Sequence, residues 1–158
     1  MQKITPCLWF DDNAEEAVNF YTGIFKNSKI GKVSRYGEST HGEKGRVMTI
    51  AFELEGLSYL ALNGGPHFKF SEAISLMVHC DTQQEIDSYW EKLLAGGGKE
   101  SQCGWLKDKF GLSWQIVPSA LPELISATVP ERAERAMQAL MKMVKIDIAA
   151  LKRASEQS

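Results

Sequence analysis

The chain repeats one order of predicted strands and helices about 70 residues apart, and this repeat limits its fold more than any other feature. The apolar segment at residues 5–10 stands 70 positions before the segment at 75–80. The aromatic pair Phe20-Tyr21 stands 69 positions before Tyr89-Trp90, so one extra residue in the first strand-to-helix turn explains the difference. The sequence therefore predicts two modules of the same topology.

Each module is predicted to run strand, helix, strand, strand, strand. In the first module, alternating apolar residues predict strands at 3–10, 29–36, 46–54 and 57–62, and helical spacing predicts a helix at 13–25. The cap of that helix is expected from Asp11, Asp12 or Asn13. In the second module, the same reasoning predicts strands at 73–80, 99–102, 105–107 and 113–117, with a helix at 82–95.

The remaining residues form a tail of different character. From Pro130 to about Arg153 the pattern predicts one long helix. Its apolar stripe could pack on its own domain or on a second subunit; the stripe comprises Met137, Leu140, Met141, Val144, Ile148 and Leu151. We predict a single domain over residues 1–158, with module one at 1–65, module two at 70–120 and a helical tail at 122–158.

Composition excludes several classes of partner. Eighteen basic and twenty acidic residues give a net charge of -2, so no basic excess is available for nucleic acid. No apolar run approaches the roughly 20 residues that span a bilayer, and the N-terminus has no long apolar signal segment. Cys7, Cys80 and Cys103 are widely spaced and odd in number, which is typical of reduced thiols. We therefore expect a cytoplasmic protein that binds neither nucleic acid nor membrane.

Three stretches of the chain carry a family resemblance. They are TPCLWFDDNAEEAVNFYTGIF at 5–25, CGWLKDKFGLSWQIVP at 103–118 and MQALMKMVKIDIAALKRA at 137–154. With the duplicated order, they resemble the PhnB-like branch of the vicinal oxygen chelate superfamily, which includes glyoxalase I, bleomycin-resistance proteins and extradiol dioxygenases. The resemblance implies an α+β fold of paired βαβββ modules around a cleft, with a C-terminal helix, usually in a homodimer. Some members of this branch are labelled as a demethylubiquinone methyltransferase domain.

The resemblance also implies where a metal would be held, on the cleft side of the first and fourth strands of each module. Strand alternation places these four positions at Thr5, Ala61, Ser75 and Gln115. Alanine has no donor atom, and neutral hydroxyls are poor ligands for a divalent transition metal. We therefore predict no metal and no other cofactor, and we expect Gln115 to hydrogen-bond a ligand or a neighbour such as Ser75.

The same alternation predicts the lining of a cleft. In the fourth strand, Leu60 and Leu62 are expected to face the helix, so their neighbours are expected to face the cleft. The predicted cleft residues are Thr5, Cys7, Trp9, Thr49, Tyr59, Asn63, Ser75, His79, Trp105 and Gln115. They predict a mostly neutral pocket with aromatic walls for a planar or amphipathic small molecule, or else side chains that simply fill the space.

No catalytic residue can be assigned from the sequence. His79 could act as a general base or bind a ligand, or it could be satisfied by hydrogen bonds at the cleft mouth. A Cys7–His79 pair is conceivable but has no evident orienting group, and Cys80 is expected to be buried.

Two functions remain open beside binding of an unknown small molecule. One is metal-dependent lyase, isomerase or dioxygenase chemistry, which rests on the resemblance alone. The other is the methyltransferase label. The chain has no glycine-rich loop of the GxGxxG or GxxxxGK[ST] type, and its order of elements does not predict a doubly wound parallel sheet for S-adenosylmethionine.

Overall fold

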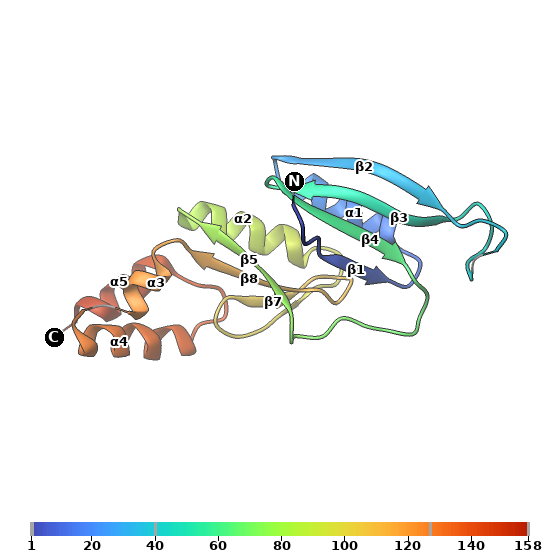
Figure 1. Cartoon of the computed structure of the whole chain (residues 1–158). Helices are drawn as coiled ribbons and strands as arrows, with labels where there is room; N and C mark the ends of the chain where they lie inside the picture. Colours follow the sequence, from blue (N-terminus) through green and yellow to red (C-terminus); the bar gives the residue numbers. More distant parts are fainter. Residues whose placement is uncertain (1, 40, 127, 158) are drawn as a thin grey trace. The chain divides into compact units, whose positions relative to one another are not determined.

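The computed structural model describes residues 2–39, 41–126 and 128–157, and the chain divides into two compact units, Met1–Phe70 and Ser71–Ser158. The first unit is one four-stranded mixed sheet with one helix (Figure 1). Along the chain it contains β1 (Cys7–Phe10), α1 (Ala14–Ile24), β2 (Ser28–Arg35), β3 (Val47–Leu54) and β4 (Leu57–Asn63). The strand order is β1-β4-β3-β2.

The second unit repeats this arrangement and adds the tail. It contains β5 (Ser75–Cys80), α2 (Gln83–Leu94), β6 (Lys99–Glu100), β7 (Trp105–Lys107), β8 (Ser113–Pro118), α3 (Leu121–Ile125), α4 (Pro130–Met141) and α5 (Ile148–Glu156). Its strand order is β5-β8-β7-β6, which matches the first sheet strand for strand. The predicted α+β fold of two βαβββ modules is confirmed.

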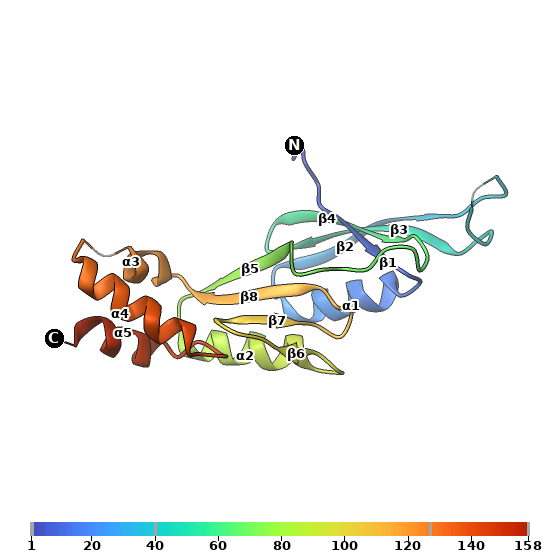
Figure 2. The same ribbon diagram turned by 90° about the horizontal axis from the view of Figure 1, so that it is seen from below.

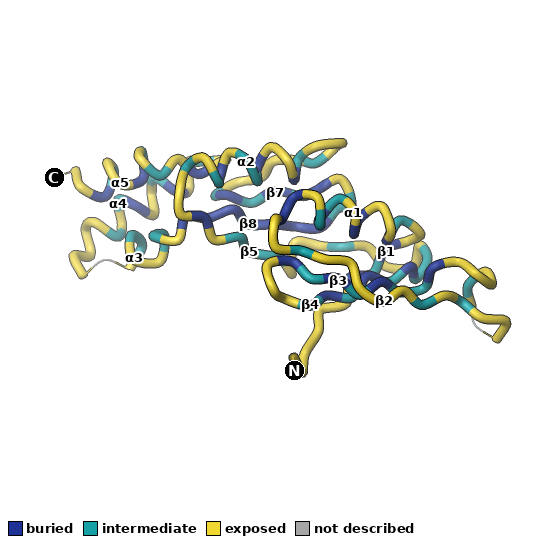
Figure 3. Tube along the Cα trace, turned by 90° about the horizontal axis from the view of Figure 1, so that it is seen from above, coloured by how far each residue is buried: buried dark blue, intermediate teal, exposed yellow. Residues whose placement is uncertain are grey.

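In each unit the first strand pairs in parallel with the fourth, and the other neighbours are antiparallel. One helix packs on one face of each sheet; Figure 2 shows α2 beside β7 and β8. The apolar side chains of that face form the core. In Figure 3 most of the trace along β8 is coloured as buried, in agreement with the burial of its residues. We call the opposite face of each sheet its uncovered face, because the helix of the same repeat does not pack on it. In the second sheet the tail packs on one end of this face, at Val117.

The hairpin between β3 and β4 turns through Glu55 and Gly56. Both residues have positive φ, 48° and 81°, which is the geometry of a two-residue turn that matches the twist of the strands. Leu54 therefore lies opposite Leu57, and every pair further along the two strands is fixed by that register.

The N-terminus of α1 is capped from a distant strand. The Asn63 side chain, at the end of β4, accepts from the Ala14 N–H at 2.8 Å and donates to Glu15 Oε1 at 2.7 Å and to the Val47 carbonyl at 3.0 Å. Asn13 occupies the N-cap position but makes no side-chain capping bond. The expectation that residues 11–13 supply the cap was thus wrong, because capping needs only a well-placed acceptor and β4 ends beside the helix.

The tail differs from the single long helix that the sequence predicts. Helices α4 and α5 are separate and pack on each other, and residues 142–147 between them are not helical. Asp147 caps α5, because its Oδ1 accepts from the Ala150 N–H at 2.9 Å. The break lets both helices bury apolar residues in one cluster with the end of β8; the cluster comprises Val117, Ala136, Leu140, Ile146 and Leu151.

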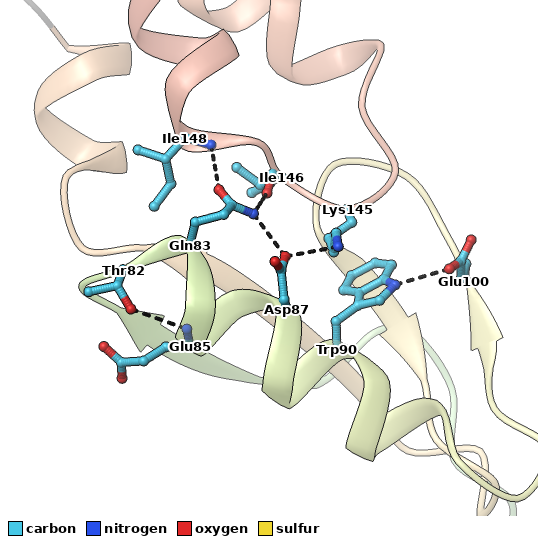
Figure 4. Close-up of polar contacts among 9 residues, drawn as sticks. All are labelled: Thr82, Gln83, Glu85, Asp87, Trp90, Glu100, Lys145, Ile146 and Ile148. Atoms are coloured by element: carbon cyan, nitrogen blue, oxygen red, sulfur yellow. Dashed lines mark hydrogen bonds and ion pairs between the residues drawn. The ribbon is translucent and has the colours of Figure 1, made fainter.

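The segment between α4 and α5 is held against α2 by polar contacts (Figure 4). The Gln83 side chain accepts from the Ile148 N–H at 2.8 Å and donates to the Ile146 carbonyl at 2.9 Å. Asp87 and Lys145 form an ion pair at 2.8 Å, and hydrogen bonding to Lys145 and Gln83 lowers the pKa of the Asp87 carboxyl. These contacts fix the tail to the second unit.

Gly104 completes this junction on the other side. Its N–H donates to the Val144 carbonyl at 2.8 Å, and a Cβ there would lie 2.7 Å from Ile146 Cδ1 and 2.9 Å from the Ile116 carbonyl oxygen. Its φ of 83° is also unfavourable for other residues. Among the described residues, no helix is long and apolar enough to cross a membrane.

We expect Asn63→Ala to lower the free energy of unfolding by about 2–4 kcal/mol, because it removes the cap of α1 and leaves buried groups without partners. Urea denaturation followed by circular dichroism measures this change. The control is Asn19→Ala on the exposed side of α1, which we expect to stay within about 0.5 kcal/mol of the wild type. Equal effects of the two variants would contradict the capping role.

We expect Gln83→Ala to destabilise the second unit by about 1–3 kcal/mol, because the Ile146 carbonyl and the Ile148 N–H lose their partner. Hydrogen exchange should accelerate at Cys103 and Gly104, whose N–H groups bond residues 143 and 144. Gln138→Ala is the control, since Gln138 makes one exposed bond of 3.3 Å to Glu134. Unchanged exchange at Cys103 and Gly104 in the Gln83 variant would show that Gln83 does not hold the tail.

Candidate functional site

The uncovered face of the first sheet holds a shallow, largely apolar cavity. Pairing in register places Cys7 and Trp9 of β1 and Thr49 of β3 on this face, as the alternation predicts. The cavity has a volume of about 390 Å³, and Thr5 is among its lining residues. A Lys29–Glu53 ion pair of 3.4 Å lies in its wall.

Two predicted cleft residues, Tyr59 and Asn63, have the strand parity of the helix-covered side, so their predicted orientation was wrong, although Tyr59 still borders the cavity of about 390 Å³. Parallel pairing sets Ala61 beside Leu8 and Asn63 beside Phe10, whose side chains form the core. Tyr59 is 9% exposed and stacks on Phe52 with ring centroids 5.4 Å apart, and burial raises the pKa of its hydroxyl.

The source of this error is the composition of β4. Leu60 and Leu62 are apolar, so alternation alone placed them in the core, but they line the uncovered face at half-buried positions. The two-residue turn at Glu55-Gly56 indicates the correct orientation of β4, because it sets Tyr59 opposite Phe52, which lies in the core. The fourth strand therefore presents leucine where Ala61 was expected, and leucine also has no donor atom.

Trp9 faces the uncovered side but is already engaged by the segment after β4. Its indole N–H donates to the Gly65 carbonyl at 2.9 Å. The Phe68 ring packs edge-on against the indole, with the ring centroids 4.9 Å apart. A Cβ on Gly64 would lie 2.4 Å from the indole, so only glycine permits this approach. Thr49 is bonded to Ser34 across the sheet. Both side chains thus lie on the uncovered face with hydrogen-bond partners from the protein: the single N–H of the Trp9 indole is engaged, and the Thr49 hydroxyl has one partner.

On the second sheet, the structure brings together the four predicted residues Ser75, His79, Trp105 and Gln115. The registers of β5 and β7 with β8 place them all on the uncovered face. Gln115 Nε2 donates to Ser75 Oγ at 2.9 Å, which confirms the expected contact between these two. His79 is exposed near the end of β5, opposite Val117.

A second cavity, of about 230 Å³, lies on this face of the second sheet. Lys99, Trp105, Lys107 and Ser113 line it, and Lys107 forms an ion pair with Glu72. Hydrogen bonding to Lys107 lowers the pKa of the Glu72 carboxyl. Trp105 belongs to the set of predicted cleft residues given above. Lys99, Lys107 and Ser113 lie side by side across three strands, an arrangement that depends on the register between the strands.

Asp108, which no sequence pattern indicates, lies at the end of β7 next to the cavity residue Lys107. It is 3% exposed, and its carboxylate accepts from the N–H groups of Phe110 and Leu112 at 2.9 and 3.1 Å and from the Trp114 indole at 2.9 Å. A carboxylate with three donors fixes the turn between β7 and β8. It therefore holds the strand that carries Ser113 and Gln115.

Neither Cys7 nor Cys80 is an activated nucleophile. Cys80 is 1% exposed, and burial, with the nearby charges of Glu85 and Asp81, raises the pKa of its thiol to about 12. Partial burial also raises the pKa of Cys7, which lies in the other unit from His79. A raised thiol pKa disfavours the reactive thiolate.

The described residues do not fit a catalytic metal. Among them, no group of three or more His, Cys, Asp or Glu side chains could hold an ion. At the positions that the superfamily uses, the first unit presents Thr5 and Leu60 or Leu62, with one hydroxyl, and the second presents Ser75 and Gln115, with one hydroxyl and one amide. Such a neutral set is a poor match for a divalent transition metal.

Comparisons with known proteins agree on one family. A profile of the 3-demethylubiquinone-9 3-methyltransferase family matches residues 2–117, which leaves α3, α4 and α5 outside the match. The chain is similar to a PhnB protein from Bacillus cereus that is described as a candidate 3-demethylubiquinone-9 3-methyltransferase. The two are 39% identical over 74% of this chain and 99% of that one, with a TM-score of 0.67.

More distant structures show the fold alone. A protein from Pseudomonas aeruginosa is 18% identical over 75% of this chain and 98% of its own, with a TM-score of 0.62. The fosfomycin resistance protein FosX from Mesorhizobium loti is 15% identical over 85% of this chain and 100% of its own, with a TM-score of 0.53. A search of curated proteins found no match. The chain therefore belongs to the 3-demethylubiquinone-9 3-methyltransferase family, the PhnB-like branch of the glyoxalase and bleomycin-resistance superfamily.

Proposed function

We propose that the protein binds a small organic molecule on the uncovered faces of its sheets, without a catalytic metal at the positions that its superfamily uses. The observation that carries this proposal is the donor set. Thr5, Ser75 and Gln115 are neutral, the fourth strand of the first sheet presents leucines, and Gln115 is bonded to Ser75. A site of this kind suits hydrogen bonding to a ligand better than Lewis-acid chemistry.

The two uncovered faces support the proposal independently. Each carries a cavity, of about 390 Å³ on the first sheet and about 230 Å³ on the second. The first is largely apolar with a few polar groups, and the second sets charged and polar side chains beside Trp105 and Leu106; both combinations occur in small-molecule sites. These volumes match small ligands better than large cofactors.

Methyl transfer is the second candidate, and the family name and the description of the Bacillus cereus relative favour it. The sheets argue against the usual architecture for S-adenosylmethionine. Each has one parallel pair, β1–β4 or β5–β8, and its other pairs are antiparallel, so neither is a doubly wound parallel sheet. The proposal of ligand binding does not depend on this label.

Purified protein should contain far less than one zinc, nickel, iron or manganese ion per chain by elemental analysis, because the donor set is neutral. Calorimetric titration with S-adenosylmethionine should show no saturable binding. A stoichiometric metal that is lost in Gln115→Ala would restore the metal-dependent enzyme. Saturable binding of S-adenosylmethionine would instead favour the methyltransferase.

We also propose that the protein is a cytoplasmic homodimer. The three free cysteines, Cys7, Cys80 and Cys103, fit a reducing compartment. The tail leaves apolar side chains exposed, with Met137 at 38%, Met141 at 63% and Val144 at 38%. Exposed apolar groups of this kind commonly mark contacts between subunits.

Light scattering at micromolar concentration should give the mass of two chains. Met141→Glu should shift the protein toward the monomer, because a charge would be placed in the contact. Lys152→Glu, on the exposed side of α5, is the control and should leave the mass unchanged. A wild-type protein that is monomeric at this concentration contradicts the dimer.

A further inference from the structure

The cavity on the second sheet contains a row of three polar side chains, of which Lys107 is paired with Glu72. Lys99 of β6 lies opposite Lys107 of β7, and Lys107 lies opposite Ser113 of β8. The three side chains therefore point to the same face, and all three line the cavity of about 230 Å³. Pairing thus places two ammonium groups and a hydroxyl in one line across the sheet.

The hydroxyl of Ser113 is the strongest sign that something else binds here. Ser113 is 1% exposed, and its Oγ has no hydrogen-bond partner among the described residues. A buried hydroxyl without a partner destabilises the fold unless a ligand or water completes it. Asp108 holds the adjoining turn by three hydrogen bonds, so the strand is well fixed at this point.

The charges of the cavity leave one cation available. Lys107 is paired with Glu72. Glu100 also borders the cavity, but its carboxylate accepts from the Trp90 indole at 3.0 Å, and it lies opposite buried Leu106. Lys99 is exposed and forms no ion pair within the described part of the chain. It can therefore meet an anionic group without breaking an existing contact.

Trp105 adds a flat apolar surface beside this row. It is half-buried, it lies opposite Gln115, and it faces the same side of the sheet. The cavity is smaller than the roughly 300 Å³ at which sites for drug-sized ligands begin, so it fits a molecule with a single ring.

We infer that this cavity binds a planar organic anion, with its ring against Trp105 and its anionic oxygens between Lys99 and Ser113. The inference rests on the proposed small-molecule function and assigns it a ligand class and a place. A carboxylate and a phosphate monoester share the required oxygens, so the experiment compares them directly.

The test is a heteronuclear NMR titration of the full chain with benzoate, phenyl phosphate and benzamide, the last being a neutral isostere of benzoate. At least one anion should shift the amide signals of β6, β7 and β8 saturably, and benzamide should not. The anion with the lower dissociation constant shows whether the site prefers a carboxylate or a phosphate monoester. Binding should weaken as salt is raised, because Lys99 is exposed.

Three variants separate a binding site from a structural feature. Lys99→Met should weaken the anion about tenfold, the usual scale of one charge-assisted contact. Ser113→Ala should also weaken it, while its melting temperature without ligand stays equal or rises, because an unpartnered hydroxyl is removed. Lys152→Met makes the same charge change on α5, outside the cavity, and should leave binding unchanged.

Three outcomes would overturn the inference: no anion binds, benzamide binds as well as benzoate, or Lys99→Met matches Lys152→Met. None of these outcomes contradicts the proposed function if a molecule that co-purifies with the protein shifts the amide signals of the first sheet, β1 to β4. A stoichiometric metal in the purified protein would remove the proposed function by a separate measurement.

Discussion

Parallel pairing of the first and fourth strands in each unit is the constraint on which the rest of the structure depends. Parallel neighbours cannot be joined by a tight turn, so the chain must leave β1 or β5 through a helix and return along the other strands. That helix covers one face of the sheet and leaves the other without a cover from the same repeat. Side chains alternate along each strand, so the pairing also decides which residues reach the uncovered face. Asn63 links the sheet to the helix, because this residue at the end of β4 caps α1, whose own N-cap residue makes no side-chain bond.

Much of this architecture can be read from the sequence, and the failures have physical causes. The ends of α1 and α2 are predicted to within one residue, because each helix has an apolar stripe and is followed by residues that end a helix. Alternation failed in β4 because both faces of that strand carry apolar groups, and there the turn at Glu55-Gly56 is the better guide to register. The break in the tail was missed because its apolar residues continue at helical spacing through residues 142–147. The contacts that favour the break come from Gln83 and Gly104, both distant in sequence.

The candidate site was harder to predict than the fold. Alternation along single strands indicates that Ser75 and Gln115 share a face, and their hydrogen bond is one of the two contacts expected of Gln115. Lys99 and Lys107 could not be found in this way, because a row across strands has no signature within any one strand. Nor could Asp108, whose three donors come from a turn and from a buried indole. Residues that act across strands become visible only when the register is known.

The two repeats share one topology but present different chemistry on their uncovered faces. In the first sheet the face is largely apolar, its Lys29 and Glu53 neutralise each other, and Trp9 is covered by Gly64 and Phe68. In the second sheet Lys99 is unpaired among the described residues and Ser113 lacks a partner. Duplicated scaffolds can diverge in this way at little cost, because outward positions of a strand are not constrained by the core. The polar groups without a partner among the described residues are thus found in the second repeat, on the sheet where we infer the anion to bind.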